Sequence, residues 1–181
     1  FLASRNYAEK WAKRNNVDLE SIPRMLGWGH RSATIMFKDK IAASRDNPYV
    51  FPHVRDTIND AFRRAGVSNV SEIDAIETHD CFTIAELIQY EALGLAEPGF
   101  GDRVVESGIA LSDGKLPVNR SGGLKAKGHP LGATGVSMHV ISAMQLAGEA
   151  NGFQLPTANI GGVFNMGGTA VANYASILES W

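Results

Sequence analysis

The chain has 181 residues, a formal net charge of −2, 44% hydrophobic and 20% charged residues, which is ordinary for a globular protein. This charge argues against wholesale binding to nucleic acid or to an anionic membrane, and no apolar stretch reaches the roughly 18 residues that a membrane span needs. The single cysteine, Cys81, excludes an internal disulfide and a multi-cysteine metal site, so we expect no metal and a reducing, cytoplasmic location.

The first quarter of the chain carries few regular patterns. Residues 5–15 predict a short helix, whereas residues 16–50 hold prolines, glycines and the run GWGHRS with no clear period. We interpret residues 1–45 as a connecting or insertion segment and residues 46–181 as the domain itself. Because the chain opens on Phe1 rather than Met, we expect it to be an excised piece or a processed product.

A helix and a strand are predicted next. Residues 52 to about 65 place apolar side chains at helical spacing on one face, namely Val54, Ile58, Ala61, Phe62 and Ala65. Gly66 follows as a C-cap. The run SEIDAIETHDCF then predicts a strand over 73–78, and a helix begins near Thr83.

The second half of the chain alternates in the same way. Residues 97–115 are turn-rich, with a short strand predicted near Val104, and KLPVN is another strand candidate. A helix from about Thr134 to Ala150 is apolar nearly all round, which is typical of a helix buried on several sides. TANIGGVF and TAVANYASILE flank NMGG and predict a terminal hairpin. Alternating strands and helices indicate an α/β layered domain.

The run GHPLGATG fixes one imidazole on a stiff turn. Pro130 keeps His129 out of the helical region, and Gly128 and Gly132 let the chain bend and a ligand approach. A neutral imidazole beside a helix start can accept a thiol proton or donate to an oxyanion. The alternative is a glycine-rich turn with a surface histidine.

The run THDCFT delivers His79, Asp80 and Cys81 at a strand-to-helix junction, where sites cluster in α/β folds. A cysteine near imidazoles and a helix start can have its pKa lowered. A buried structural cysteine is the equally open alternative.

Two further glycine runs could contact a ligand. In SGGLKAKG, Gly122 and Gly123 with Lys125 and Lys127 could cradle a phosphorylated or amide-bearing ligand, or form a solvated loop. In VFNMGGTA, Gly167 and its neighbour allow a tight turn or close approach to a substrate. His139 is interpreted as a satisfied core residue, and no role is assigned to His30 or His53.

Together these runs resemble the C-terminal half of a thiolase of the acetyl-CoA acetyltransferase type. The resemblance rests on THDCF at 78–82, NRSGGLKAKGHPLGATG at 119–135 and NIGGVFNMGGTAVA at 159–172, and covers residues 50–181. The usual Asn-Glu-Ala-Phe motif reads His79-Asp80-Cys81-Phe82 here, and the usual cysteine before the last glycine pair is absent. Both departures match the sterol-carrier-protein branch of the family.

The resemblance implies a fold and a set of roles. The fold is a mixed β-sheet with helices on both faces and one buried helix. His129 activates a nucleophilic cysteine and helps an oxyanion hole, Cys81 is the acid and base at the substrate α-carbon, and His79 is an oxyanion donor. The substrate and coenzyme A site is implied at Ser121, Gly122, Gly128, Gly167 and Gly168.

The implied activity is Claisen condensation or thiolysis of a 3-ketoacyl-CoA, with a coenzyme A thioester as substrate and no bound cofactor. The acyl-accepting cysteine belongs to an N-terminal half, so we expect residues 1–181 alone to be inactive and the whole protein to form a homo-oligomer, with acyl-CoA as its small-molecule partner. Three alternatives stay open: a non-catalytic acyl-CoA-binding or assembly subunit, a thiolase-fold thioesterase, decarboxylase or retro-aldolase, and a structural domain with coincidental glycine loops.

Overall fold

The computed structural model describes residues 1–181. The helices are α1 (Arg5–Asn15), α2 (Phe37–Ala43), α3 (Pro52–Ala65), α4 (Thr83–Leu93), α5 (Asp102–Glu106), α6 (Gly123–Lys127) and α7 (Thr134–Leu146). The strands are β1 (Arg24–Ser32), β2 (Ala75–Glu77), β3 (Ile160–Gly167) and β4 (Ala172–Glu179), and 3₁₀ turns cover Leu19–Ser21, Val70–Glu72 and Asn151–Phe153.

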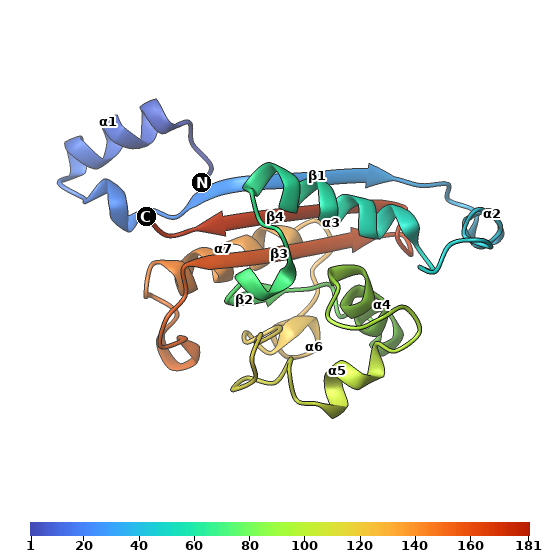
Figure 1. Ribbon diagram of the computed structural model, residues 1–181. Helices are drawn as coiled ribbons and strands as arrows, with labels where there is room; N and C mark the ends of the chain where they lie inside the picture. The colour runs from blue at the N-terminus through green and yellow to red at the C-terminus, as the bar shows by residue number, and fades with distance from the viewer.

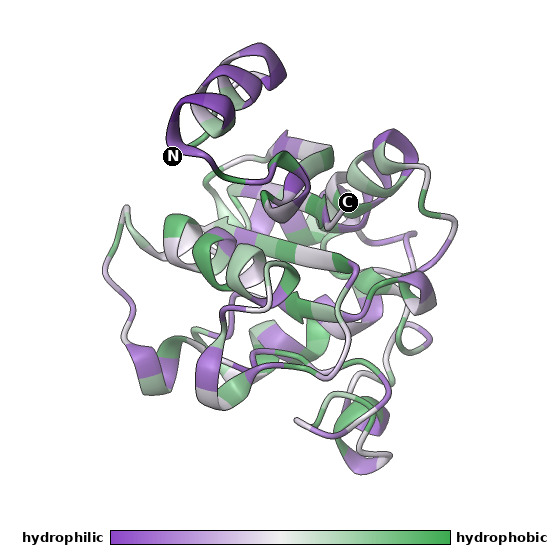
Figure 2. Cartoon of the chain, turned by 90° about the vertical axis from the view of Figure 1, so that its left-hand side faces the viewer, coloured by the Kyte–Doolittle hydropathy of each residue, from purple (hydrophilic) through white to green (hydrophobic).

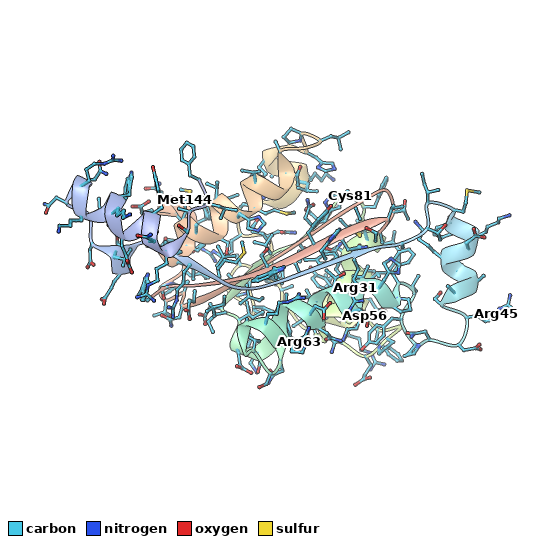
Figure 3. The ribbon with its side chains drawn as sticks, turned by 90° about the horizontal axis from the view of Figure 1, so that it is seen from above. Arg31, Arg45, Asp56, Arg63, Cys81 and Met144 are labelled. Atoms are coloured by element: carbon cyan, nitrogen blue, oxygen red, sulfur yellow. The ribbon has the colours of Figure 1, made fainter.

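The four strands form one mixed sheet in the order β1-β4-β3-β2 (Figure 1). Strand β4 is antiparallel to both β1 and β3, and β2 runs parallel to β3. Helices α3 and α7 lie on opposite sides of this sheet (Figure 3), with α3 against β1 and β4 and α7 against β3 and β2. The expected mixed sheet with helices on both faces, and the terminal hairpin of β3 and β4, are confirmed.

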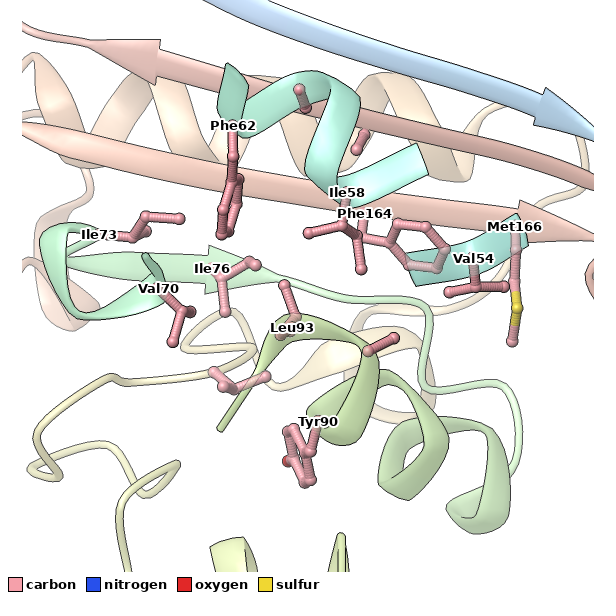
Figure 4. Packing of buried hydrophobic residues seen from close by; sticks show 14 of the residues in the cluster. Val54, Ile58, Phe62, Val70, Ile73, Ile76, Tyr90, Leu93, Phe164 and Met166 are labelled. Carbon is pink, nitrogen blue, oxygen red and sulfur yellow. The ribbon is translucent and has the colours of Figure 1, made fainter. Parts of the chain in front are cut away.

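Helix α3 forms because its sequence supplies both ends and one apolar face. Pro52 occupies the first turn, and Gly66 ends the helix in the left-handed region at φ 73°. The predicted stripe is buried in the main core except for Ala65, which is partly buried, and Ile58 and Phe62 pack there with Phe164 of β3 and Ile76 of β2 (Figure 4). This core fixes where β2 ends, and the residues that follow β2 belong to the candidate site.

Strand β1 corrects the expectation that residues 16–50 are irregular. It pairs with β4 through a register that includes Gly29 opposite Ala175. A Cβ on Gly29 would lie 1.8 Å from the Thr57 carbonyl oxygen, and one on Gly27 would lie 2.3 Å from that of Ala61. The two glycines therefore let α3 approach the strand closely. The sheet includes part of residues 1–45, and the division at residue 45 stays a prediction.

Two further element predictions are corrected. The residues around Val104 form α5 rather than a strand, and Val104 points into the core at 1% exposure while Val105 stays 52% exposed. The KLPVN run makes a single parallel bridge between Val118 and Ile76 rather than a full strand. Helix α1 is confirmed but is largely hydrophilic and stands away from the sheet (Figure 2).

Helix α7 is buried on its sheet side and open on the other. Met138 is fully buried, whereas Val136 and Val140 are 66% and 51% exposed. The helix was predicted to be buried on several sides, but only its sheet side is buried. Its other side exposes apolar residues. No helix in the structure combines the length and the apolar character needed to cross a membrane.

The close approach of α3 to β1 generates a stability prediction. Replacing Gly29 by Ala drives a methyl group into the α3 backbone, so we expect the free energy of unfolding to fall by about 1–3 kcal/mol. Gly152→Ala is the matched control, since its Cβ meets nothing within 4 Å. Urea unfolding of both variants measures the difference, and equal stabilities would contradict the packing argument.

Candidate active site

The loop that carries His79 and Cys81 leaves β2 and is clamped by α4. The Gln89 side chain accepts from the His79 N–H at 2.9 Å and donates to the His79 carbonyl oxygen at 2.7 Å. Gln89 is fully buried, so both contacts are sheltered from water. At the start of the loop, the Thr78 N–H donates to Asn119 Oδ1 at 2.8 Å.

Asp80 ties this loop to the glycine run that precedes His129. Its Oδ1 accepts from the Leu124 N–H at the start of α6 at 2.9 Å. Gly123 lies in the left-handed region at φ 66°, and a Cβ there would meet Asp80 Oδ2 at 2.0 Å. Only glycine therefore lets the two loops come together at this point.

A buried ion pair forms a second link between the same two segments. Glu77, 4% exposed at the end of β2, lies 2.7 Å from Lys127 Nζ and accepts from the Ser121 hydroxyl at 2.6 Å. Lys127 also donates to Ser121 Oγ at 2.9 Å. The Lys127 ammonium and the Ser121 hydroxyl are thus engaged by Glu77, whereas Lys125 on the same short helix is exposed.

His129 follows α6 on an exposed turn and is oriented by the first residue of α7. His129 Nδ1 lies 2.7 Å from the Thr134 hydroxyl oxygen. When that hydroxyl donates to the Pro130 carbonyl oxygen at 3.2 Å, its oxygen accepts from His129 Nδ1–H. The neutral ring then carries a lone pair on Nε2. This is the tautomer that a proton acceptor requires.

His79 stands beside His129. The two rings meet edge to face with centroids 4.9 Å apart, and His79 Nδ1 lies 2.7 Å from Asn165 Oδ1 on β3. Burial, with a smaller contribution from the charge of His129, lowers the pKa of His79 below its ordinary value of 6.5. With the Asn165 carbonyl facing it, the neutral ring holds its proton on Nδ1. A proton on Nε2 requires the Asn165 amide nitrogen to face Nδ1 instead.

One groove collects five of the eight predicted site residues. His129, Cys81, His79, Gly167 and Gly168 line it together with Asn165, in a hollow of about 1890 Å³ that continues along α7 and the face of β1 and β4. In Figure 3, Cys81 lies at one end of the strands.

The other three predicted residues are placed differently. Ser121, Gly122 and Gly128 do not line the groove. Ser121 faces Glu77, while Gly122 and Gly128 start and end α6 at φ 89° and 91°.

Burial changes the expectation for Cys81. Loss of hydration raises the pKa of its thiol above 9.0, and the neighbouring Asp80 charge adds to the rise. The predicted lowering by imidazoles is therefore wrong: the half-buried sulfur loses more from desolvation than it gains. At neutral pH the thiol is protonated, so acid–base work requires a neighbouring proton acceptor.

Sequence reasoning missed Asn165, Thr134 and Gln89 as residues that orient the site. Asn165 is separated from the last glycine pair by Met166 alone, and Thr134 follows the Gly-His-Pro run, so both lie inside quoted motifs. Gln89 carries no sequence signal, because its role depends on α4 folding back over the loop. No group of three or more metal-ligating side chains is present.

Comparison with known proteins places residues 36–180 under the family described as "Thiolase C-terminal domain-like". An acetyl-CoA acetyltransferase from Methanothermobacter thermautotrophicus is 42% identical over 138 residues, which are 76% of this chain and 34% of that protein. Sterol carrier protein 2 from Bos taurus is 50% identical over 97 residues, 54% of this chain and 18% of that protein. The chain thus spans about a third or less of these relatives.

Among solved structures, the Ltp2-ChsH2(DUF35) aldolase superposes with a TM-score of 0.69 at 20% identity. The match covers 86% of this chain and 39% of that chain. At this identity the likeness shows a shared fold.

The buried histidine generates a pH prediction. Because the folded pKa of His79 lies below 6.5, its contribution to stability is complete above that pH and is lost as the pH falls through the folded pKa. An NMR titration should find the His79 pKa below 6.5. In His129→Gln it should move upward yet stay below 6.5, because burial is the larger cause. A value at or above 6.5 in the unsubstituted protein would contradict this account.

The ion pair generates a second prediction. Lys127→Met leaves Glu77 buried without its cation, so we expect a loss of about 3–5 kcal/mol in the free energy of unfolding. Lys125→Met removes an exposed charge from the same helix and should change stability by less than about 0.5 kcal/mol. Chemical unfolding of both variants measures the difference between their free energies of unfolding. Equal values would show that Glu77 is exposed to water and would contradict the prediction.

Proposed function

This chain belongs to the thiolase C-terminal domain family, and we propose that the protein containing it makes or breaks the carbon–carbon bond of a 3-ketoacyl-CoA. One observation carries the proposal: two imidazoles, Cys81 and the glycine hairpin line one groove. The ring centroids of the two imidazoles are 4.9 Å apart. These groups reach the groove from three separate parts of the sequence.

Cys81 is proposed as the acid and base at the α-carbon of the thioester. Removing that proton produces an enolate, whose negative oxygen must be met by fixed hydrogen-bond donors. The thiol is protonated at neutral pH, because burial raises its pKa. It therefore needs a proton acceptor before it can act as a base.

The two histidines are proposed for different steps. The lone pair on His129 Nε2 suits it to take the proton from a nucleophilic thiol, in line with its Nδ1 contact to Thr134 at 2.7 Å. His79 is proposed as an oxyanion donor. It can donate in the tautomer that has the proton on Nε2 and the Asn165 amide nitrogen facing Nδ1. The backbone of Gly167 and Gly168 is proposed to contact the substrate beside them.

A second cysteine is needed for acyl transfer. Covalent catalysis requires a nucleophile that holds the acyl group while another group works on the α-carbon, and residues 1–181 contain only Cys81. We propose that an N-terminal half supplies it. That half would cover the open side of α7, where Val136 and Val140 are exposed, and Trp28 of β1, which is 55% exposed.

The activity prediction uses the full-length protein and a 3-ketoacyl-CoA. Cys81→Ala and Cys81→Ser should each lower the thiolysis rate by about 10²- to 10⁴-fold, because they remove the acid–base group. His129→Ala should fall into the same range. His139→Gln is the control within the same groove. Both His139 ring nitrogens are occupied, by the Gly135 carbonyl at 2.6 Å and the Ser176 hydroxyl at 3.0 Å, so this variant should keep most of the rate.

A second measurement isolates the role of Cys81. Exchange of the acetyl-CoA methyl protons with deuterated water should be lost in Cys81→Ala even though acyl transfer to the upstream cysteine continues. Unchanged exchange would remove Cys81 from the proposed step. Steady thiolysis by residues 1–181 alone, abolished by His129→Ala, would show that no upstream nucleophile is required.

A further inference from the structure

The hairpin between β3 and β4 adopts an unusual backbone. Three consecutive residues lie in the left-handed region: Gly168 at φ 61°, Thr169 at φ 54° and Ala170 at φ 62°. Residues with a Cβ disfavour this region, so two of the three need support from their surroundings. Two of the residues, Gly168 and Thr169, line the groove with Cys81 and His79.

Side chains from outside the turn hold its carbonyl oxygens. Lys40 of α2 donates through Nζ to the Thr169 carbonyl at 2.6 Å and lies 3.4 Å from that of Gly168. His53 Nε2 lies 2.8 Å from the Ala170 carbonyl, and Asn173 Nδ2 donates to the same oxygen at 3.0 Å. All three carbonyls of the left-handed turn are thus engaged. Figure 1 shows α2 at the end of the sheet where β3 turns into β4.

The ammonium of Lys40 has no carboxylate partner. Lys40 is 4% exposed, and it takes part in none of the salt bridges of the structure. A buried cation without an anion is unfavourable unless fixed dipoles compensate it. Here the carbonyls of Gly168 and Thr169 supply those dipoles, so the position of the cation and the conformation of the turn depend on each other.

Peptide geometry then decides where the amide groups of the turn point. In a trans peptide the carbonyl of one residue is opposite the N–H of the next. Because Lys40 binds the carbonyls of Gly168 and Thr169, the N–H groups of Thr169 and Ala170 point away from it. Neither these two nor the Gly168 N–H donates to any acceptor in the protein, whereas the Val171 N–H closes the turn on the Gly167 carbonyl at 2.9 Å.

We infer that Lys40 is a positioning residue, which holds the 168–170 turn so that the free N–H groups of Gly168 and Thr169, the two turn residues that line the groove, can donate to the negatively charged oxygen of an acyl thioester. The inference rests on the proposed function for the identity of that oxygen. Lys40 itself touches no substrate and acts through the backbone of the turn. Its place in the chain, within the segment interpreted as connecting, gives that segment a part in the active site.

The test compares Lys40→Met with Lys38→Met in the full-length protein. Lys38 lies on the same helix and is exposed. Hydrogen–deuterium exchange of residues 164–172 should speed up by at least about 10-fold in Lys40→Met and stay unchanged in Lys38→Met. The kcat for 3-ketoacyl-CoA thiolysis should fall about 10- to 100-fold with little change in KM, because the donors act mainly in the transition state.

Two further variants keep the test decisive. Lys40→Arg, which preserves the charge and the donors, should recover most of the kcat and of the exchange protection. If Lys40→Met does not fold, Lys40→Gln replaces it in the same measurements. Unchanged exchange in the hairpin, or a loss of activity that only follows the loss of folded protein, would overturn the inference. An inactive unsubstituted protein would contradict the proposed function, while the exchange measurement would still decide the role of Lys40.

Discussion

Two carboxylates, one at the end of β2 and one in the loop that follows it, hold the candidate site together. Glu77 binds Lys127 and Ser121, and Asp80 binds the N–H of Leu124. Their partners lie more than forty residues further along the chain, in the run that leads to His129. A buried ion pair is weak support for stability by itself, because apolar replacements often do as well. Here it links the end of β2, just before the loop that bears Cys81, to the last residue of α6.

The structure also explains which parts of the molecule the sequence could predict. Helix α3 was predictable, because its stripe faces a core on one side and solvent on the other. Strand β1 was hidden, because the positions that face α3 are Gly27 and Gly29, which carry no hydrophobic signal. Trp28 and His30, which alternate with these glycines, line the groove. The two-residue period of a strand is therefore present, but it alternates glycine with aromatic residues instead of apolar with polar residues.

The candidate site divides in the same way. Short motifs predicted that His79, Cys81 and His129 lie near one another, and the groove brings all three together. They could not predict that Ser121 faces Glu77 instead of the groove, or that burial outweighs the imidazoles at the Cys81 thiol. Both features depend on which distant elements of the chain pack over Ser121 and Cys81. The spacing of residues within a short motif contains no information on such packing.

Desolvation therefore constrains how the site can work. Burial already favours the neutral forms of His79 and of the Cys81 thiol, and any further half of the protein that covers the groove removes more water and strengthens both effects. A stable thiolate waiting for substrate is disfavoured in such a place. In the proposed reaction, proton removal from the substrate carbon then has to be coupled to transfer of the thiol proton onto a neighbouring base, while uncharged backbone donors meet the oxygen on which charge develops. Under this constraint, the proposed reaction depends more on the orientation of the rings and of the 168–170 turn than on the resting charge of any single side chain.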